Sequence, residues 1–295
     1  METVGVIGLG TMGKGLALRL AERGYRVLGW NRTPLYDPQE MAQVHIVSQL
    51  TAITAEASVI ILSLADYHAA YDLITRLDLA SAPQGRTILQ FGTISPQQVH
   101  QLRELVVSAS PAHALLDVGM LGNHMHARNG ELRLFVGGET EAYQRVQDLL
   151  AAMSKQITCV GDLGMGMVAK LALNLLMGIE MEALAEAVLF GERYGLDRKV
   201  LIEALASSGF SSPVMSFKAR RMSAQTYGRP DFRLALMHKD LKLFSEACAA
   251  RGIAAPAAEG SLEVLQAAQD QGLGEQDCVA IEIALSTLKH EVKQR

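Results

Sequence analysis

"TVGVIGLGTMGKGLALRLAERG" (3–24) is the stretch that decides the fold. Residues 3–8 form an apolar run typical of a buried strand, and residues 11–24 have the apolar periodicity of a helix. Between them lies the motif GxGxxG, as "GLGTMG" (8–13). A turn of this kind presents the first amides of a helix, and their positive potential, to a pyrophosphate group. The stretch therefore predicts a dinucleotide-binding unit; a glycine-rich turn that binds no ligand is the alternative.

Each glycine of the motif has a physical reason to be there. Gly8 allows the tight turn, Gly10 lets a pyrophosphate approach the backbone, and Gly13 lets the helix pack on the strand. We predict that the whole turn contributes to the cofactor site, through Gly8, Leu9, Gly10, Thr11, Met12 and Gly13.

The end of the second strand candidate, "YRVLGW" (25–30), indicates which nicotinamide cofactor binds. A site for NAD usually has Asp or Glu here, which accepts from the ribose 2′-hydroxyl. This chain has Asn31, Arg32 and Thr33 instead. A guanidinium and a hydroxyl hold a 2′-phosphate that a carboxylate would repel. The prediction is NADPH/NADP+, with a solvated surface arginine as the alternative interpretation of Arg32.

Strand and helix candidates alternate through the first half of the chain. This alternation predicts an α/β fold with a Rossmann-type, mostly parallel, doubly wound sheet over residues 1–162. Residues 163–295 are predicted to form an all-α domain for substrate binding and dimerisation, entered by a long helix over 165–194 that contains no proline. The remaining strand candidates are 58–64, 86–92, 113–120, 132–138 and 156–161, and the helix candidates between them include 95–109 and 139–153.

Composition excludes several classes of protein. The net charge of −4, without a basic stripe, makes nucleic acid a poor first candidate for a partner. The three cysteines are far apart and form no CxxC, which indicates a reduced protein without structural zinc. The chain opens without a basic segment typical of a signal peptide, and no apolar run reaches the length of about 18 residues that spans a bilayer. We expect a soluble, cytoplasmic protein that binds neither membrane nor metal.

The segment "GMGMVAKLALNLLM" (164–177) contains one lysine and one asparagine in an otherwise apolar helix. Lys170 and Asn174 are four residues apart, so their side chains lie on one helical face. A buried lysine is costly unless it has a partner or a function. These two residues are the candidates for catalysis; a lysine that snorkels from a helix end is the alternative.

Almost the whole chain resembles the β-hydroxyacid dehydrogenase family, which includes 3-hydroxyisobutyrate dehydrogenase. The motifs that carry the resemblance keep the family's order and spacing. They are "GLGTMG" (8–13), "TISP" (93–96), "NGELRLFVGG" (129–138), "GDLGMGMVAKLALN" (161–174) and "HKDLKL" (238–243).

The resemblance implies roles for individual residues. Lys170 would be the general acid/base on the substrate oxygen, and Asn174 would orient the substrate. Thr93 and Lys239 would lie near the nicotinamide ribose, and Asp240 would bind substrate or, more in keeping with its place, support the helix start. Leu64 and Ala65, at the end of the strand candidate 58–64, complete the expected cofactor site. The family also implies a homodimer or homotetramer built through the C-terminal half.

One segment departs from the family pattern. The family's substrate motif is Asp-Ala-Pro-Val-Ser-Gly-Gly, whose Ser-Gly-Gly part holds a carboxylate, whereas this chain has "DVGMLGN" (117–123). An apolar side chain at Leu121 removes a donor, so a substrate larger or less polar than a small 3-hydroxy acid is favoured. The expected substrate-binding residues are Met120, Leu121, Gly122, Asn123, Met177 and Asp240, although Met177 also suits a plain core position. His124 and His126 follow and are interpreted as loop histidines, since a metal pair would need further ligands.

Three functions remain open on the sequence. The first is an NADPH-dependent oxidoreductase that moves hydride between the nicotinamide and a carbonyl or secondary alcohol. The second is an imine reductase, because "WNRTP" (30–34) and "DYHAAYDLI" (66–74) resemble segments common in that group. Imine reductases usually have Asp or Tyr where Lys170 stands, which favours the carbonyl reaction. The third is a dinucleotide-binding protein without catalysis.

Overall fold

The computed structural model describes residues 2–33 and 37–288. Pro34, part of the stretch that resembles imine reductases, lies outside the described residues. The chain divides into two compact units, Met1–Lys170 and Leu171–Arg295, which are described separately below as unit 1 and unit 2. The division falls within the long helix α7 (Met165–Arg193), whereas the sequence places the domain boundary at residue 162.

Unit 1 is built on an eight-stranded sheet in the order β3-β2-β1-β4-β5-β6-β7-β8 among the described residues. Neighbouring strands are parallel except β6 and β7, which are antiparallel. The predicted, mostly parallel Rossmann-type sheet is therefore confirmed. The strands are β1 (Thr3–Ile7), β2 (Arg26–Trp30), β3 (His45–Ile46), β4 (Val59–Leu62), β5 (Thr87–Gln90), β6 (Ala114–Leu121), β7 (Leu132–Gly137) and β8 (Ser154–Gly161).

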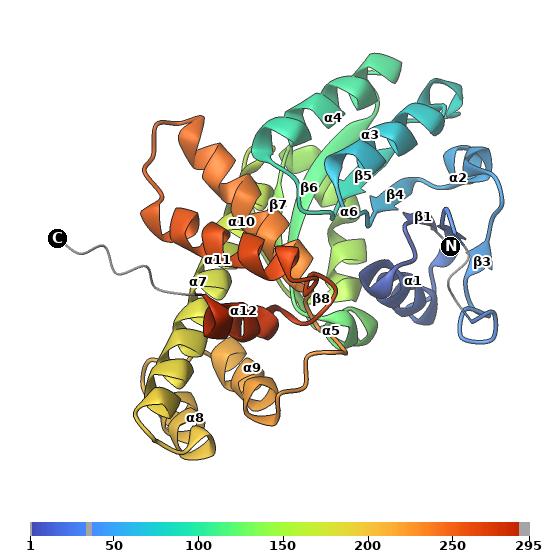
Figure 1. The fold of residues 1–295 in the computed structure, drawn as a ribbon. Helices are drawn as coiled ribbons and strands as arrows, with labels where there is room; N and C mark the ends of the chain where they lie inside the picture. Colours follow the sequence, from blue (N-terminus) through green and yellow to red (C-terminus); the bar gives the residue numbers. More distant parts are fainter. Residues whose placement is uncertain (1, 34–36, 289–295) are drawn as a thin grey trace. The chain divides into compact units, whose positions relative to one another are not determined.

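Helices cover both faces of this sheet (Figure 1). One core lies under α1 (Thr11–Glu22), α5 (His124–Asn129) and α6 (Thr140–Met153), whose buried apolar side chains meet those of alternate strand positions. The other core lies under α2 (Leu50–Glu56), α3 (Tyr67–Arg76) and α4 (Pro96–Ala109). The strands β1, β2, β4, β5 and β6 are almost wholly buried, which explains their mostly apolar sequences.

Unit 2 is helical throughout its described residues, as the sequence predicts. Its core joins apolar side chains from α7, the 3₁₀ turn η2 (Cys278–Ala280) and the other helices. No described helix is long and apolar enough to cross a membrane. The other helices are α8 (Arg198–Ser207), α9 (Pro213–Ala224), α10 (Leu234–Ala249), α11 (Pro256–Asp270) and α12 (Ile281–Thr287).

Candidate functional site

The glycine-rich turn after β1 has no room for side chains at two of its three glycines. Gly8 has a φ of +93°, and a Cβ added there would lie 2.3 Å from the carbonyl oxygen of Ser63. A Cβ added at Gly13 would lie 1.8 Å from the carbonyl oxygen of Gly8. A Cβ at Gly10, in contrast, would meet no atom within 4 Å. The chain is thus packed tightly on both sides of Gly10 and open at Gly10 itself.

This opening suits the pyrophosphate of a dinucleotide. Gly10 is the N-cap of α1 and has no side chain to accept from the first amides of the helix, which include those of Thr11 and Met12. Those amides and the helix dipole therefore remain available to an anion. The turn also lies at the carboxyl ends of β1 and β4, where the strand order reverses, and this is where doubly wound folds bind nucleotides. The residues of this turn fit the pyrophosphate of a dinucleotide cofactor.

Asn31 links this turn to the loop after β2. Its Oδ1 accepts from the amide of Leu9 at 3.1 Å, and its Nδ2 donates to the carbonyl oxygen of Thr33 at 2.5 Å. Both Oδ1 and Nδ2 of Asn31 are therefore hydrogen-bonded to backbone groups. Arg32 and Thr33 are exposed beyond it. These two hydrogen bonds link the loop after β2 to the glycine-rich turn, with Arg32 and Thr33 at the surface.

The other cofactor candidates of unit 1 follow the next two strands. Leu64 and Ala65 lie between β4 and α3, and Thr93 lies between β5 and α4. Gly92 brings the two segments together, because a Cβ there would lie 2.3 Å from the carbonyl oxygen of Leu64. The structure therefore gathers these residues and the glycine-rich turn at the carboxyl ends of adjacent parallel strands.

The segment that departs from the family pattern ends β6 and starts α5. Met120 and Leu121 are the last two residues of β6, and Gly122 follows with a φ of +142°. The Oδ1 of Asn123 accepts from the amides of Met125 and His126, and the amide of Asn123 donates to Nδ1 of His126.

The interpretation of His124 and His126 as loop residues is wrong. Both lie in α5, and His126 forms one side of the capping box that starts this helix. Asn123 belongs to the expected substrate-binding set, and its side-chain oxygen accepts from two amides of the first turn of α5.

Asp117 anchors the start of α7. It is fully buried, and its two carboxylate oxygens accept from the amides of Gly164, at 2.8 Å, and Met167, at 2.7 Å. Burial raises the pKa of Asp117 above its ordinary value, and the two amide hydrogen bonds oppose that rise. A carboxylate at a helix N-terminus also complements the helix dipole. Asp117 therefore attaches the first turn of α7 to β6.

Two glycines bring the same helix close to β6. A Cβ added at Gly119 would lie 2.6 Å from the carbonyl oxygen of Gly166 and 3.0 Å from Cβ of Lys170. A Cβ added at Gly166 would lie 2.5 Å from the carbonyl oxygen of Asp117. Lys170 is half-buried in the second turn of α7. The backbone that carries Lys170 is thus fixed by close packing as well as by Asp117.

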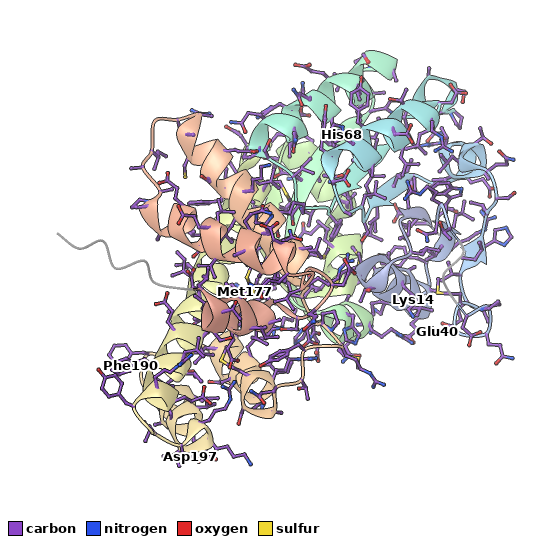
Figure 2. All side chains as sticks on the ribbon, viewed as in Figure 1. Lys14, Glu40, His68, Met177, Phe190 and Asp197 are labelled. Carbon is purple, nitrogen blue, oxygen red and sulfur yellow. The ribbon has the colours of Figure 1, made fainter. Side chains whose placement is uncertain are left out.

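Unit 2 holds the remaining candidates. Asn174 is buried, and its Nδ2 donates to Oδ2 of Asp240 at 2.5 Å. Lys239 places its Nζ 2.8 Å from the other oxygen of Asp240, as an ion pair without hydrogen-bond alignment. Met177, labelled in Figure 2, packs against the core of unit 2, which supports its interpretation as a core residue. The contact between Asn174 and Asp240 is one that sequence spacing alone does not reveal.

Comparisons with known proteins agree with this arrangement. Residues 3–161 match the family model for the NAD binding domain of 6-phosphogluconate dehydrogenase. Residues 164–284 match the model for the NAD-binding domain of NADP-dependent 3-hydroxyisobutyrate dehydrogenase. The chain belongs to the β-hydroxyacid dehydrogenase family. It is accordingly an oxidoreductase with a nicotinamide dinucleotide cofactor.

Individual relatives cover nearly the whole chain. The 2-hydroxy-3-oxopropionate reductase of Escherichia coli K12 is 28% identical over 97% of each chain. The Mycobacterium tuberculosis 3-hydroxyisobutyrate dehydrogenase, solved with L-serine, superposes with a TM-score of 0.85 at 25% identity, over 97% of this chain and 99% of the other. An imine reductase from Myxococcus stipitatus, with NAD+, shares the fold at a TM-score of 0.64 and 17% identity, over 97% and 99%.

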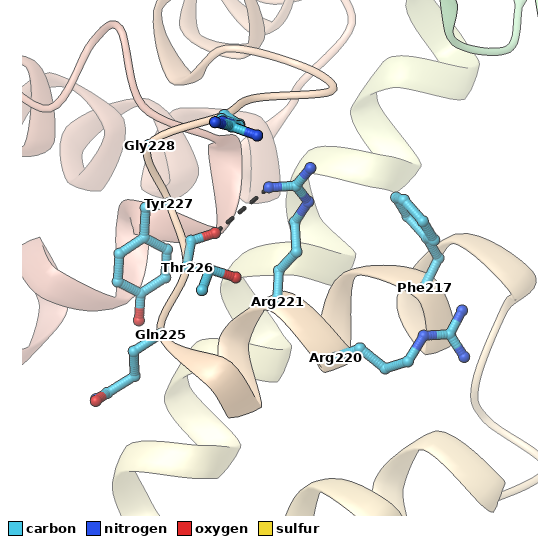
Figure 3. A pocket seen from close by; sticks show the side chains of 8 residues that line it. Phe217, Arg220, Arg221, Gln225, Thr226, Tyr227 and Gly228 are labelled. Atoms are coloured by element: carbon cyan, nitrogen blue, oxygen red, sulfur yellow. Dashed lines mark hydrogen bonds between the residues drawn. The ribbon is translucent and has the colours of Figure 1, made fainter. Parts of the chain in front are cut away.

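One hollow on the surface of unit 2 contains none of the candidate residues. It has a volume of about 860 Å³ and lies between α9 and the segment after it, where Arg221 donates to the carbonyl oxygen of Thr226 (Figure 3). Among residues 2–33 and 37–288, no group of three His, Cys, Asp or Glu side chains could hold a metal ion.

Proposed function

We propose that this chain is an NADPH-dependent oxidoreductase that interconverts a carbonyl compound and a secondary alcohol. NADPH, when bound, supplies the hydride. Lys170 gives a proton to the substrate oxygen during reduction and takes it back during oxidation, and Asn174 orients the substrate. The observation that carries the proposal is the fixed position of Lys170, whose helix is attached to β6 by Asp117. A proton donor needs a fixed position close to its target, and the closely packed backbone of Lys170 supports that role.

The substrate that we propose is larger or less polar than a small 3-hydroxy acid. Leu121 stands where the family has a serine. Its side chain therefore offers no hydroxyl donor to a substrate carboxylate. We propose a cytoplasmic location for the enzyme as well.

An imine reductase is the second candidate, supported by the shared fold of the solved imine reductases. A panel of ketones, semialdehydes and cyclic imines, assayed with NADPH, separates the possibilities. We expect turnover of carbonyl compounds. Turnover of cyclic imines alone would favour the second candidate, and tight NADPH binding without any turnover would favour a protein that binds the dinucleotide without catalysis.

Arg32→Ala is expected to weaken NADPH binding and to leave NADH binding nearly unchanged. The exposed guanidinium would lose a charge-assisted hydrogen bond to the 2′-phosphate, which contributes about 1.5–3 kcal/mol. Titration of both cofactors by fluorescence measures the effect. Arg145→Ala, which removes an exposed arginine on α6, is the matched control. Equal affinity of the wild type for NADPH and NADH would contradict the assignment.

We also propose a homodimer or homotetramer, because unit 2 exposes large apolar side chains. Phe190, which projects from α7 in Figure 2, is 65% exposed, and Tyr194 is 82% exposed, with the two rings 4.8 Å apart. Phe210 is 93% exposed. Light scattering at micromolar concentration is expected to give at least twice the chain mass of 31.9 kDa. Phe190→Glu should shift the protein toward monomer, and a monomeric wild type would refute the proposal.

A further inference from the structure

Two helices of unit 2 meet closely at Asn174. One turn after Asn174 on α7 stands Gly178, where an added Cβ would lie only 2.8 Å from Cδ1 of Leu241 on α10. This glycine lets the two helices approach until Asn174 reaches Asp240, the residue before Leu241. Both polar side chains are buried by this approach, with exposures of 1% for Asn174 and 2% for Asp240.

The chemistry of Asp240 decides which way the Asn174 amide faces. An ionised carboxylate only accepts hydrogen bonds, so the NH₂ group of Asn174 must be the side that faces it. Nδ2 of Asn174 donates to Oδ2 of Asp240, and the negative charge of the acceptor strengthens this hydrogen bond. The ammonium of Lys239 lies 2.8 Å from the second carboxylate oxygen and places a cation beside the charge. The orientation of the amide therefore follows from its neighbour.

That orientation leaves the amide oxygen in need of a donor. Oδ1 of Asn174 is buried, and no donor within the described part of the chain forms a hydrogen bond with it. Buried acceptors are rarely left in this state, because the group loses its hydration and gains nothing in return. A bound ligand can supply the hydrogen-bond donor that Oδ1 of Asn174 lacks.

We propose that Asp240 is a positioning residue that holds the Asn174 amide with its oxygen free to accept from the substrate. The assignment rests on the proposed function, in which Asn174 contacts the substrate. Asp240 then acts through Asn174 and does not bind substrate itself, in contrast to its place in the expected substrate-binding set. The substrate must carry an O–H or N–H donor beside its reacting carbon.

A double-mutant cycle tests whether the two residues act as one. Asn174→Ala and Asp240→Ala should each lower kcat/KM for reduction of hydroxyacetone by NADPH about 10- to 100-fold, the scale of a charge-assisted hydrogen bond. The kcat/KM of the double variant should be no lower than that of the less active single variant, because the second substitution removes no further interaction with the substrate. Asp240→Asn should recover part of the loss, since its amide oxygen still accepts from Asn174. Losses that multiply in the double variant would overturn the proposal.

A comparison of two substrates tests whether Asn174 accepts a hydrogen bond from the substrate. Hydroxyacetone carries a hydroxyl where 2-butanone, of similar size, carries a methyl group. The wild type should prefer hydroxyacetone, and Asn174→Ala should abolish the preference. An unchanged preference in this variant would overturn the acceptor role.

A measurement without turnover separates this inference from the proposed function. The side-chain amide of Asn174 is identified in ¹⁵N NMR spectra by its disappearance in Asn174→Ala. Its signals should shift and exchange faster with solvent in Asp240→Ala, and should stay close to the wild-type positions in Asp240→Asn. Unchanged signals in Asp240→Ala would overturn the positioning role. If the wild type reduces no carbonyl compound, the proposed function and the acceptor role fall together, while the amide signals still decide the positioning.

Discussion

Lys170→Met is expected to lower kcat for carbonyl reduction by about 10²- to 10⁴-fold, the usual contribution of a general acid. Affinity for NADPH should stay nearly unchanged, because methionine keeps the length and apolar stem of lysine and removes only the ammonium. The position of the backbone should also be kept, since Asp117, Gly119 and Gly166 hold the helix without involving the Lys170 head group. Asn174→Ala should cost less, because Asn174 transfers no proton.

Steady-state kinetics over a range of pH distinguishes a proton donor from a structural lysine. The profile of the Lys170→Met variant should lose the limb that reports the lysine in the wild type. Lys199→Met, on the exposed surface of α8, is the matched control and should leave the profile intact. A Lys170→Met variant that reduces ketones at the wild-type rate would remove Lys170 from the mechanism. Cyclic imines provide the comparison with the second candidate: an iminium already carries its proton, so the loss of Lys170 should matter less there.

The sequence predicts the features that depend on near neighbours. The glycine-rich turn needs residues no more than five positions apart, and the long helix needs only a stretch without proline, so both predictions are confirmed by β1, α1 and α7. Short helices and strands are not predicted in this way. The strand β3 has two residues, and α5 has six and depends on the capping box between Asn123 and His126. A histidine in a capping role gives no signal that distinguishes it from a loop histidine.

Contacts between residues far apart in the chain are not predicted from the sequence, for a different reason. Asp117 and Gly164 are 47 positions apart, and Asn174 and Asp240 are 66 apart. The two residues of each pair are brought together by the fold of the chain between them. The sequence around each residue therefore does not identify its partner. The family resemblance supplied roles for Lys170 and Asn174, whereas the residues that hold them in place became evident only from the structure.

The ion pair between Lys218 and Asp277 belongs to the same class of contact, 59 positions apart. Lys218, on α9, is 3% exposed, and its Nζ lies 2.8 Å and 2.7 Å from the two carboxylate oxygens of the fully buried Asp277. Asp277 also accepts from the amides of Asp231 and Val279. The pair therefore ties α9 to the segment before α10 and to η2, within the core of unit 2.

Lys218→Met is expected to destabilise unit 2 by about 3–5 kcal/mol, because it leaves the Asp277 charge buried without its main partner. Arg221, with Nε 3.9 Å from Asp277, compensates for only part of the loss. The double variant Lys218→Met, Asp277→Asn should be less destabilised than the single variant, since no charge is left unpaired.

The neighbouring thiol offers a direct measurement. Cys278 is fully buried, and burial raises its pKa to about 12, so it should react with a thiol reagent only when unit 2 opens. In a background where Cys159 and Cys248 are replaced, its labelling rate should rise at least about 100-fold in Lys218→Met, at 1.4 kcal/mol for each factor of ten. Trp30, the single tryptophan, lies in β2 of unit 1, and its fluorescence transition should move far less. Unchanged labelling of Cys278 would mean that the buried pair contributes little to the stability of unit 2.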